Sequence, residues 1–205
     1  MTVSINLQDW FGGIDIYLFD QLLKGRIEPG MGVLDAGCGT GRNLVYLLRV
    51  GFEVFAVDES MGAVAQTRRL AAALAPHLAE DNFRVEPVEQ MSFPDAGFEV
   101  VLSSAVLHFA RDEAHWRAMM GEMWRVMKPG GIFWARLASS IGMEDQVRLI
   151  SERRYNLPDG SQRFLVDEAM LLQVSGALGG ELFEPIKTTL VQNQRAMTTW
   201  CLRKQ

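Results

Sequence analysis

The chain has 205 residues, which favours one domain with a small elaboration over two full domains. Hydrophobic residues make up 48% of it and charged residues 22%, a balance that excludes a disordered or fibrous protein. The formal net charge of −5 disfavours a protein that binds duplex nucleic acid or an anionic membrane.

The N-terminal segment is expected to be helical, because Ile14, Leu18 and Leu22 recur at helical intervals. Beyond it, short apolar runs alternate with segments of helical period, a pattern typical of parallel βαβ units. The expected strands are 32–36, 53–57, 83–86, 98–102 and 132–137. The expected helices run from Leu44 to Gly51, over 61–76, and from the capping residue Asp112 to the turn at 128–131.

The third of these helices carries a stripe of large apolar side chains. The stripe follows helical spacing and consists of Trp116, Met119, Met120, Met123, Trp124 and Met127. Such stripes usually pack in a hydrophobic core, so we expect a core face and not a surface that lines a cofactor.

The pattern changes after the fifth strand. The turn sequence Pro-Asp-Gly-Ser at 158–161 separates two extended segments and predicts a small hairpin. Asp167 can cap a helix over 168–178, and the extended segments 182–192 and 196–203 are expected to pair antiparallel. We expect one domain with four segments: an N-terminal helical lid (1–30), a cofactor-binding core (31–140), a substrate-side insertion (141–180) and a C-terminal β-hairpin (181–205).

The most informative segment is the glycine loop at 33–41, Val-Leu-Asp-Ala-Gly-Cys-Gly-Thr-Gly. Glycine lets a ligand approach bare backbone, and a following helix N-terminus offers unpaired N–H groups, so an anionic or strongly polar ligand is expected here. A nucleoside triphosphatase loop requires Gly-Lys-Ser/Thr, whereas 41–43 is Gly-Arg-Asn. That class of enzyme is therefore excluded.

The glycine spacing also bears on dinucleotide binding. The loop reads Gly37-x-Gly39-x-Gly41 and not Gly-x-Gly-x-x-Gly, which weakens the case for an NAD(P)-dependent oxidoreductase without removing it. Asp58 ends the second expected strand, where a carboxylate can accept hydrogen bonds from both hydroxyls of a ribose or cap the next helix. Asp35 ends a buried strand, and the cost of burying a carboxylate favours a role in the site over a turn cap.

Taken with these features, the sequence resembles the class I S-adenosylmethionine-dependent methyltransferases. Five motifs carry the resemblance in order, at 33–41, 54–61, 91–95, 103–109 and 127–131. Short details at 41–43 and 102–107 are similar to the tellurite-resistance-type branch. The resemblance implies an α/β fold, a three-layer sandwich around a Rossmann-like seven-stranded sheet that is mostly parallel with an antiparallel last strand.

The resemblance also implies a set of site residues. Gly37 and Gly39 would pass beside the methionine moiety, Asp58 would hold the ribose, and Glu59 and Met61 would flank the adenine. The segment 88–90 would close the far side, and Pro87 stands where many relatives carry Asp. The full implied cofactor set is Asp35, Gly37, Cys38, Gly39, Asp58, Glu59, Met61, Glu89, Gln90 and Ser104.

Candidate residues for the acceptor side come from three places. His108 follows the fourth strand and could take a proton from a substrate, with packing or cofactor contact as the competing interpretation. Trp10 and Tyr17 are candidates for a lid, and Arg154, Tyr155 and Arg163 for a cap over the substrate, against a core role or a solvated hairpin. His115 is expected to be solvated or to cap its helix.

The two cysteines, Cys38 and Cys201, are too few for a disulfide framework and lack the spacing of a metal site. Cys38 is expected to be a small loop residue and not a nucleophile. No run of 18 apolar residues occurs and the first residues carry no leader-like positive charge, so a cytoplasmic protein is expected. Nothing in the sequence indicates the oligomeric state.

The predicted function is methyl transfer from S-adenosylmethionine to a small-molecule nucleophile by in-line displacement, with no metal, nucleic acid or membrane partner. Two alternatives stay open at this point. One is an NAD(P)-dependent oxidoreductase on the same kind of sheet, and the other is a non-catalytic module that binds S-adenosylmethionine and regulates a partner.

Overall fold

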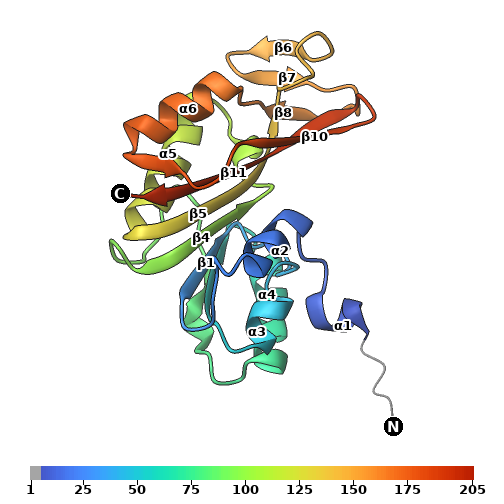
Figure 1. The fold of residues 1–205 in the computed structure, drawn as a ribbon. Coiled ribbons are helices and arrows are strands. Elements are labelled where there is room, and N and C mark those ends of the chain that lie inside the picture. The colour runs from blue at the N-terminus through green and yellow to red at the C-terminus, as the bar shows by residue number, and fades with distance from the viewer. Residues whose placement is uncertain (1–5) are drawn as a thin grey trace.

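The computed structural model describes residues 6–205, so the first five residues of the expected N-terminal segment lie outside it. A central sheet runs in the order β10, β11, β5, β4, β1, β2, β3, and a short strand β9 also pairs with β11 (Figure 1). The strands are β1 (Gly32–Ala36), β2 (Glu53–Asp58), β3 (Phe83–Val85), β4 (Phe98–Ser104), β5 (Met127–Ser139), β9 (Gly180–Leu182), β10 (Lys187–Val191) and β11 (Arg195–Lys204).

The strand directions agree with the expected fold class. Strands β3, β2, β1, β4 and β5 are parallel, and β11 is antiparallel to each strand that it pairs with. The prediction of a mostly parallel sheet of seven strands with an antiparallel last strand is confirmed, with β9 as an addition at the end of β11.

Helices cover both faces of this sheet (Figure 1). One hydrophobic core includes Leu18 and Leu47 from the side of α2 (Ile16–Leu23), α3 (Val45–Arg49) and α4 (Met61–Leu74). The other includes Trp116 and Met170 from α5 (Glu113–Val126) and α6 (Glu168–Ala177). The remaining helical segments are α1 (Leu7–Phe11), η1 (Glu80–Asn82) and η2 (Leu107–Phe109). The three-layer sandwich is therefore confirmed.

The β1 sequence explains why both faces can be covered. Val33 belongs to the core beside α2–α4, whereas Leu34 belongs to the core beside α5 and α6, and all five residues of the strand are buried. Side chains of a strand alternate between faces, so a continuous apolar run buries both. β1 lies between β2 and β4, in the middle of the sheet.

The stripe on α5 packs in the core as predicted. Asp112 caps the helix, since its carboxylate accepts the backbone N–H of His115 at 2.7 Å. Trp116 is fully buried and stacks between Phe164 and Trp200, with ring centroids 6.1 and 6.2 Å away. β5 begins directly after this helix, so the expected turn at 128–131 lies inside the strand, where Met127 pairs with Phe98.

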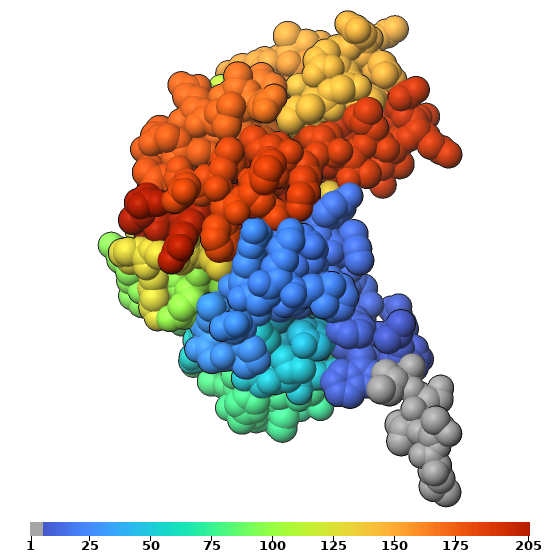
Figure 2. Space-filling view, viewed as in Figure 1, coloured from blue at the N-terminus to red at the C-terminus, as the bar shows by residue number. Residues whose placement is uncertain are grey.

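A second, three-stranded sheet is formed by β6 (Arg148–Ser151), β7 (Arg154–Asn156) and β8 (Gln162–Phe164). The hairpin β7–β8 is the predicted one, and β6 is an unpredicted third strand. The small sheet and β10 project to one side of the molecule, above the N-terminal helices (Figure 2). Within the segment 141–180, which was expected to be a substrate-side insertion, α6 packs in the main core.

Among residues 6–205, no helix is both long enough and apolar enough to cross a membrane.

Candidate active site

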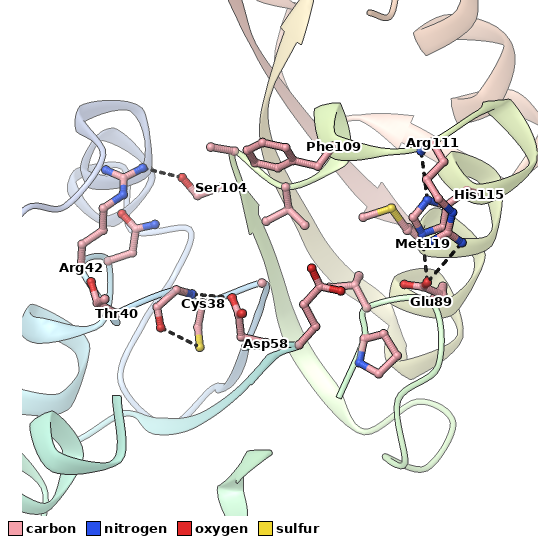
Figure 3. A pocket seen from close by; sticks show the side chains of 18 residues that line it. Cys38, Thr40, Arg42, Asp58, Glu89, Ser104, Phe109, Arg111, His115 and Met119 are labelled. Atoms are coloured by element: carbon pink, nitrogen blue, oxygen red, sulfur yellow. Dashed lines mark hydrogen bonds and ion pairs between the residues drawn. The ribbon is translucent and has the colours of Figure 1, made fainter. Parts of the chain in front are cut away.

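A cleft of about 680 Å³ opens where β1, β2 and β4 end. Its walls come from the loops that follow these strands and from the first turns of α5 (Figure 3). Ligands of open parallel sheets bind at the carboxyl ends of the strands, and the volume lies in the range of small-molecule sites. The cleft contains seven of the predicted site residues, namely Gly37, Cys38, Gly39, Asp58, Glu59, Glu89 and Ser104.

The glycine loop forms one wall of the cleft and is held by the neighbouring strand. The N–H groups of Gly37 and Cys38 donate to the carbonyl oxygen of Val57 at 2.8 and 2.9 Å. Gly37 has a φ of +83°, and a Cβ added to it would come within 2.4 Å of the Val106 side chain. Only glycine fits this position, where bare backbone faces the cleft.

The expected order of strand, loop and helix is present, but the glycines do not stand directly ahead of the helix. Residues 41–44 form turns, and α3 begins only at Val45 and spans five residues. Arg42 occupies this turn. Its guanidinium donates to the Ser104 hydroxyl at 2.9 Å and to the Gly13 carbonyl oxygen at 3.1 Å (Figure 3). The cleft wall is thus built from glycine backbone and an arginine, and not from a helix N-terminus.

Asp58 points its carboxylate at the glycine loop. One oxygen accepts the Gly39 N–H at 2.9 Å and the other accepts the Ser60 N–H at 2.9 Å. Each carboxylate oxygen has a further lone pair, so the group can still accept hydrogen bonds from a ligand. The competing interpretation of Asp58 as the cap of α4 is wrong, because Ser60 is the N-cap and accepts the Ala63 N–H.

Two predicted residues of the loop are buried. Asp35 is 1% exposed and does not line the cleft, and neither carboxyl oxygen has a hydrogen-bond partner among residues 6–205. Burial raises the pKa of Asp35 to about 7, opposed by Arg42 and reinforced by Asp58. Burial also raises the pKa of the Cys38 thiol to about 12. Cys38 is therefore a protonated thiol at neutral pH, as expected of a loop residue and not of a nucleophile.

The opposite wall comes from the segments after β2 and β3 and from the start of α5. Glu59 and Glu89 line it, whereas Met61 is 74% exposed outside the cleft and Gln90 is exposed as well. The structure therefore does not bring Met61 and Gln90 to the site. Met61 is the first residue of α4, which carries it away from the cleft.

His115 was expected to be solvated or to cap its helix. It is not solvated, because its side chain lines the cleft with Nε2 3.0 Å from a Glu89 oxygen, but its Nδ1 does accept the Arg111 backbone N–H at 3.1 Å, just before the N-cap residue of α5 (Figure 3). Sequence reasoning also missed Arg42, Phe109 and Arg111. Met119, which was expected to face the core and not a cofactor, packs in the core and also lines the cleft. For His115 and Met119 the signal was their place in the first turns of a helix that begins soon after β4, where the sheet presents its carboxyl ends.

His108 lies outside the cleft and lines a second cavity of about 330 Å³. Ala105 lines both, so the two spaces adjoin at this residue. The His108 ring is 7% exposed, and its Nδ1 accepts the Ala138 backbone N–H at 3.2 Å. Burial lowers the pKa of His108 to about 4, with the nearby charges of Arg163 and Arg195 acting in the same direction.

The two lid candidates line neither space. Trp10 is 42% exposed in α1, where its ring lies 6.0 Å from the Arg49 guanidinium. The Tyr17 hydroxyl makes a 2.7 Å hydrogen bond with the Thr189 hydroxyl, which ties α2 to β10. The structure does not bring these two side chains to the cleft, and their role as a lid stays a prediction.

Two of the three cap candidates face elsewhere. Arg154 donates to the Ala110 carbonyl oxygen at 3.4 Å, and Tyr155 packs against a small hydrophobic cluster that contains Leu157 and Leu165. The third candidate, Arg163, lines the second cavity. The small sheet therefore reaches this cavity through β8 and the turn before it.

Residues 33–131 match the family described as methyltransferase domain. A curated relative, the malonyl-[acyl-carrier protein] O-methyltransferase of Serratia marcescens, is 32% identical over 108 residues, which cover 53% of this chain and 38% of that protein. The chain thus spans well under half the length of that relative.

Two solved structures share the fold. A SAM-dependent methyltransferase from Methanosarcina mazei aligns with a TM-score of 0.73 at 18% identity, covering 89% of this chain and 96% of its own. The Burkholderia thailandensis 1,6-didemethyltoxoflavin-N1-methyltransferase, solved with 1,6-didemethyltoxoflavin and S-adenosylhomocysteine, aligns with a TM-score of 0.69 at 20% identity and covers 97% and 84%. The similarity to the tellurite-resistance-type branch stays a prediction.

Proposed function

We propose that this chain transfers a methyl group from S-adenosylmethionine to a small-molecule nucleophile, since residues 33–131 match the methyltransferase domain family. The observation that carries the proposal is the cleft lined by the glycine loop and Asp58, at the carboxyl ends of the central strands. It presents bare backbone beside a carboxylate with free lone pairs.

The donor set fits this cofactor. We assign Gly37 and Gly39 to the methionine part, since a side chain at Gly37 would collide with Val106. Asp58 would accept hydrogen bonds from the ribose hydroxyls, and Glu59 and Glu89 would border the adenine. Asp35 lies beneath the loop, so we assign it a positioning role and no direct contact.

When bound, S-adenosylmethionine supplies a methyl carbon on a cationic sulfur, and the acceptor's lone pair forms the new bond while the carbon–sulfur bond breaks and its electron pair stays on sulfur. The chain's residues hold the cofactor and the acceptor in line and exclude water between them. Orientation of this kind is worth at best about 7 to 11 kcal/mol of the barrier. It requires no residue that forms a covalent bond to the substrate.

The same observations also bear on the two alternative functions. The Gly37-x-Gly39-x-Gly41 spacing and the family match both favour S-adenosylmethionine over NAD(P). No feature of the cleft favours binding without turnover.

The Serratia relative is named for a substrate on an acyl carrier protein, so an acceptor carried by such a protein should be tested beside free small molecules. We place the reaction in the cytoplasm.

The proposal is tested by calorimetric titration with S-adenosylmethionine, S-adenosylhomocysteine and NADH. We expect saturable binding of the two sulfur nucleosides alone. Binding of NADH alone would replace the proposal with the oxidoreductase.

A substitution at Asp58 tests the ribose assignment. Asp58→Asn keeps an oxygen that can accept the Gly39 N–H but removes the charge. Each charge-assisted hydrogen bond is worth about 1.5 to 3 kcal/mol, so we expect affinity for S-adenosylhomocysteine to fall at least about 10-fold. Asp145→Asn, at an exposed carboxylate outside the cleft, is the matched control. Unchanged affinity in a folded Asp58→Asn protein would refute the assignment.

A further inference from the structure

We propose that the second cavity, at His108, binds the methyl acceptor and that this acceptor is a small organic acid held through its carboxylate. The inference rests on the proposed function and names the substrate class that the same site would take. It is carried by three arginines around the cavity, by the tautomer of His108 and by the junction of the two spaces at Ala105.

The cavity is lined by an excess of positive charge. Arg136, Arg163 and Arg195 reach it from β5, β8 and β11, and Asp159 is the one carboxylate among its described lining residues. Arg195 lies 3.8 Å from Asp159, and Arg136 lies 3.3 Å from Asp15. Arg163 forms no ion pair with any carboxylate of residues 6–205. Arg163 is half-buried and has no carboxylate partner among these residues, so its guanidinium is available to an anion from outside the chain.

Arg163 is also oriented for such an anion. Its guanidinium lies 4.8 Å from the centroid of the Phe109 ring, and its Nη1 donates to the Gln162 carbonyl oxygen at 2.8 Å. These contacts fix the plane of the guanidinium, which binds carboxylates through two parallel N–H groups. Phe109 in turn lines the cofactor cleft, so the arginine and the cleft share a wall.

His108 adds a hydrogen-bond donor. Its Nδ1 accepts the Ala138 N–H, and a neutral imidazole carries its one proton on the other nitrogen, so Nε2 is the donor. The lowered pKa of about 4 keeps the ring neutral at physiological pH. A ring that offers N–H to the cavity pairs with a ligand oxygen. His108 is therefore a positioning residue for the acid and not the general base that its place after β4 suggested.

Ala105, where the second cavity adjoins the cofactor cleft, has a constrained backbone conformation. Ala105 follows β4 with a φ of +63°, and its N–H donates to the Arg136 carbonyl oxygen at 2.7 Å. A non-glycine residue in this backbone region is held there by its surroundings and is frequent at functional sites. An acid held by Arg163 and His108 would therefore extend its far end past Ala105 toward the methyl group.

The size of the cavity limits the acceptor. About 330 Å³ is near the lower end of the range for small-molecule sites. This space suits a compound with a single ring or a short chain, and it is too small to enclose a nucleotide or a folded peptide.

The test compares acids with their neutral isosteres by calorimetry, on protein saturated with S-adenosylhomocysteine and on protein without it. The probes are benzoate, 4-hydroxybenzoate and malonate, each paired with its amide, together with phenyl phosphate. We expect at least one acid to bind about 10-fold or more tightly than its amide, since the amide lacks the charge. If no acid exceeds its amide, the proposal is wrong, and a 10-fold preference for phenyl phosphate would replace the carboxylate with a phosphate.

Substitutions at Arg163 test whether the acid binds in the second cavity. Arg163→Gln should weaken the acid about 10-fold or more and leave the amide unchanged, and Arg163→Lys should recover part of the loss because it keeps the charge. Arg148→Gln, at an exposed arginine of β6 in the same small sheet, is the control and should change neither. Equal affinities in Arg163→Gln and Arg148→Gln would overturn the assignment.

Titration of the same variants with S-adenosylhomocysteine separates this inference from the proposed function. Arg163 lies outside the cofactor cleft, so Arg163→Gln should bind the nucleoside like the wild type, which also shows that it is folded. If the wild type fails to bind the nucleoside while acids still bind through Arg163, the methyltransferase proposal fails and the acid site stands. The reverse pattern would overturn the acid site alone.

Discussion

At the scale of single residues, Asp35 is the side chain whose surroundings are most at odds with its charge. It is the penultimate residue of the central strand β1, it is 1% exposed, and its oxygens lack hydrogen-bond partners among the described residues. An ionised carboxylate in such a place would be very costly, and the raised pKa of about 7 means that the folded protein keeps the proton. The strength of this effect depends on pH.

The Asp35 carboxyl stabilises the folded chain less as the pH rises. Below about pH 3.8, the carboxyl is protonated in the folded and the unfolded chain alike, and its stabilising effect is fully present. Between there and about pH 7, the folded chain holds a proton that the unfolded chain releases, so the free energy of unfolding falls as the pH rises. Above about pH 7 the loss is complete.

Asp35→Asn should remove this dependence. We expect the melting temperature of the variant, relative to that of the wild type, to rise from pH 4 to pH 7.5 and then to level off. The change corresponds to on the order of 3 kcal/mol, or several degrees for a chain of this size. Calorimetric melting without ligand measures it, with the exposed Asp81→Asn as control. A constant difference between Asp35→Asn and wild type across this range would contradict the raised pKa.

At the scale of elements, a cluster of charges joins α2 to the segment between β9 and β10. The Glu184 side chain is 6% exposed, and its carboxylate lies 2.8 Å from Lys24, 2.9 Å from Arg26 and 3.1 Å from Lys187. Burial alone would raise the pKa of Glu184, but hydrogen bonds from Lys24, Lys187 and Arg26 lower it to about 2. The cluster therefore holds the end of α2 against the segment between β9 and β10.

Glu184→Gln should loosen this connection. The lowered pKa means that the stabilisation is complete above about pH 4.5 and is lost as the pH falls through about 2. We expect the free energy of unfolding at pH 7 to drop by about 1 to 3 kcal/mol, because three cations lose a charged partner. The difference should shrink toward zero near pH 2. Urea unfolding at several pH values checks this, and an equal loss in the exposed Glu53→Gln control would refute it.

The elements also show what sequence could and could not predict. Strands with buried apolar runs, such as β1 and β4, were predicted to within two residues, since burial leaves a periodic signal. β6 was not predicted because all four of its residues are exposed, and β9 was not predicted because it has three residues and begins with the second glycine of a pair. Neither strand has a pattern that differs from a loop.

The residues of the site that lie near one another in the sequence could be predicted, whereas those that come from distant segments could not. Gly37, Gly39 and Asp58 belong to the unit β1–α3–β2, so their spacing alone predicted that they lie together. The second cavity joins Arg136, Arg163 and Arg195, which come from three strands in two sheets. Only the tertiary fold brings such residues together, and no local spacing records it.

At the scale of the whole molecule, the two hydrophobic cores share one sheet. Each central strand contributes alternate side chains to both, as Val33 and Leu34 do, and Trp116 links α5 to β8 and β11. Opening either core would expose one face of the same strands and remove the support of the other. The chain should therefore unfold as one cooperative unit and not as separate segments.

This cooperativity can be measured together with ligand binding. We expect urea unfolding curves from far-ultraviolet circular dichroism and tryptophan fluorescence to coincide, since tryptophans such as Trp134 and Trp200 are buried in different cores. S-adenosylhomocysteine at 100 times its dissociation constant should shift both curves equally, by about 2.7 kcal/mol, because it binds only the folded chain. If the curves separate, or if the ligand shifts only one, then the part of the chain that forms the cofactor cleft and the C-terminal part unfold independently. The second cavity, which needs strands from both parts, would then form only when both are folded.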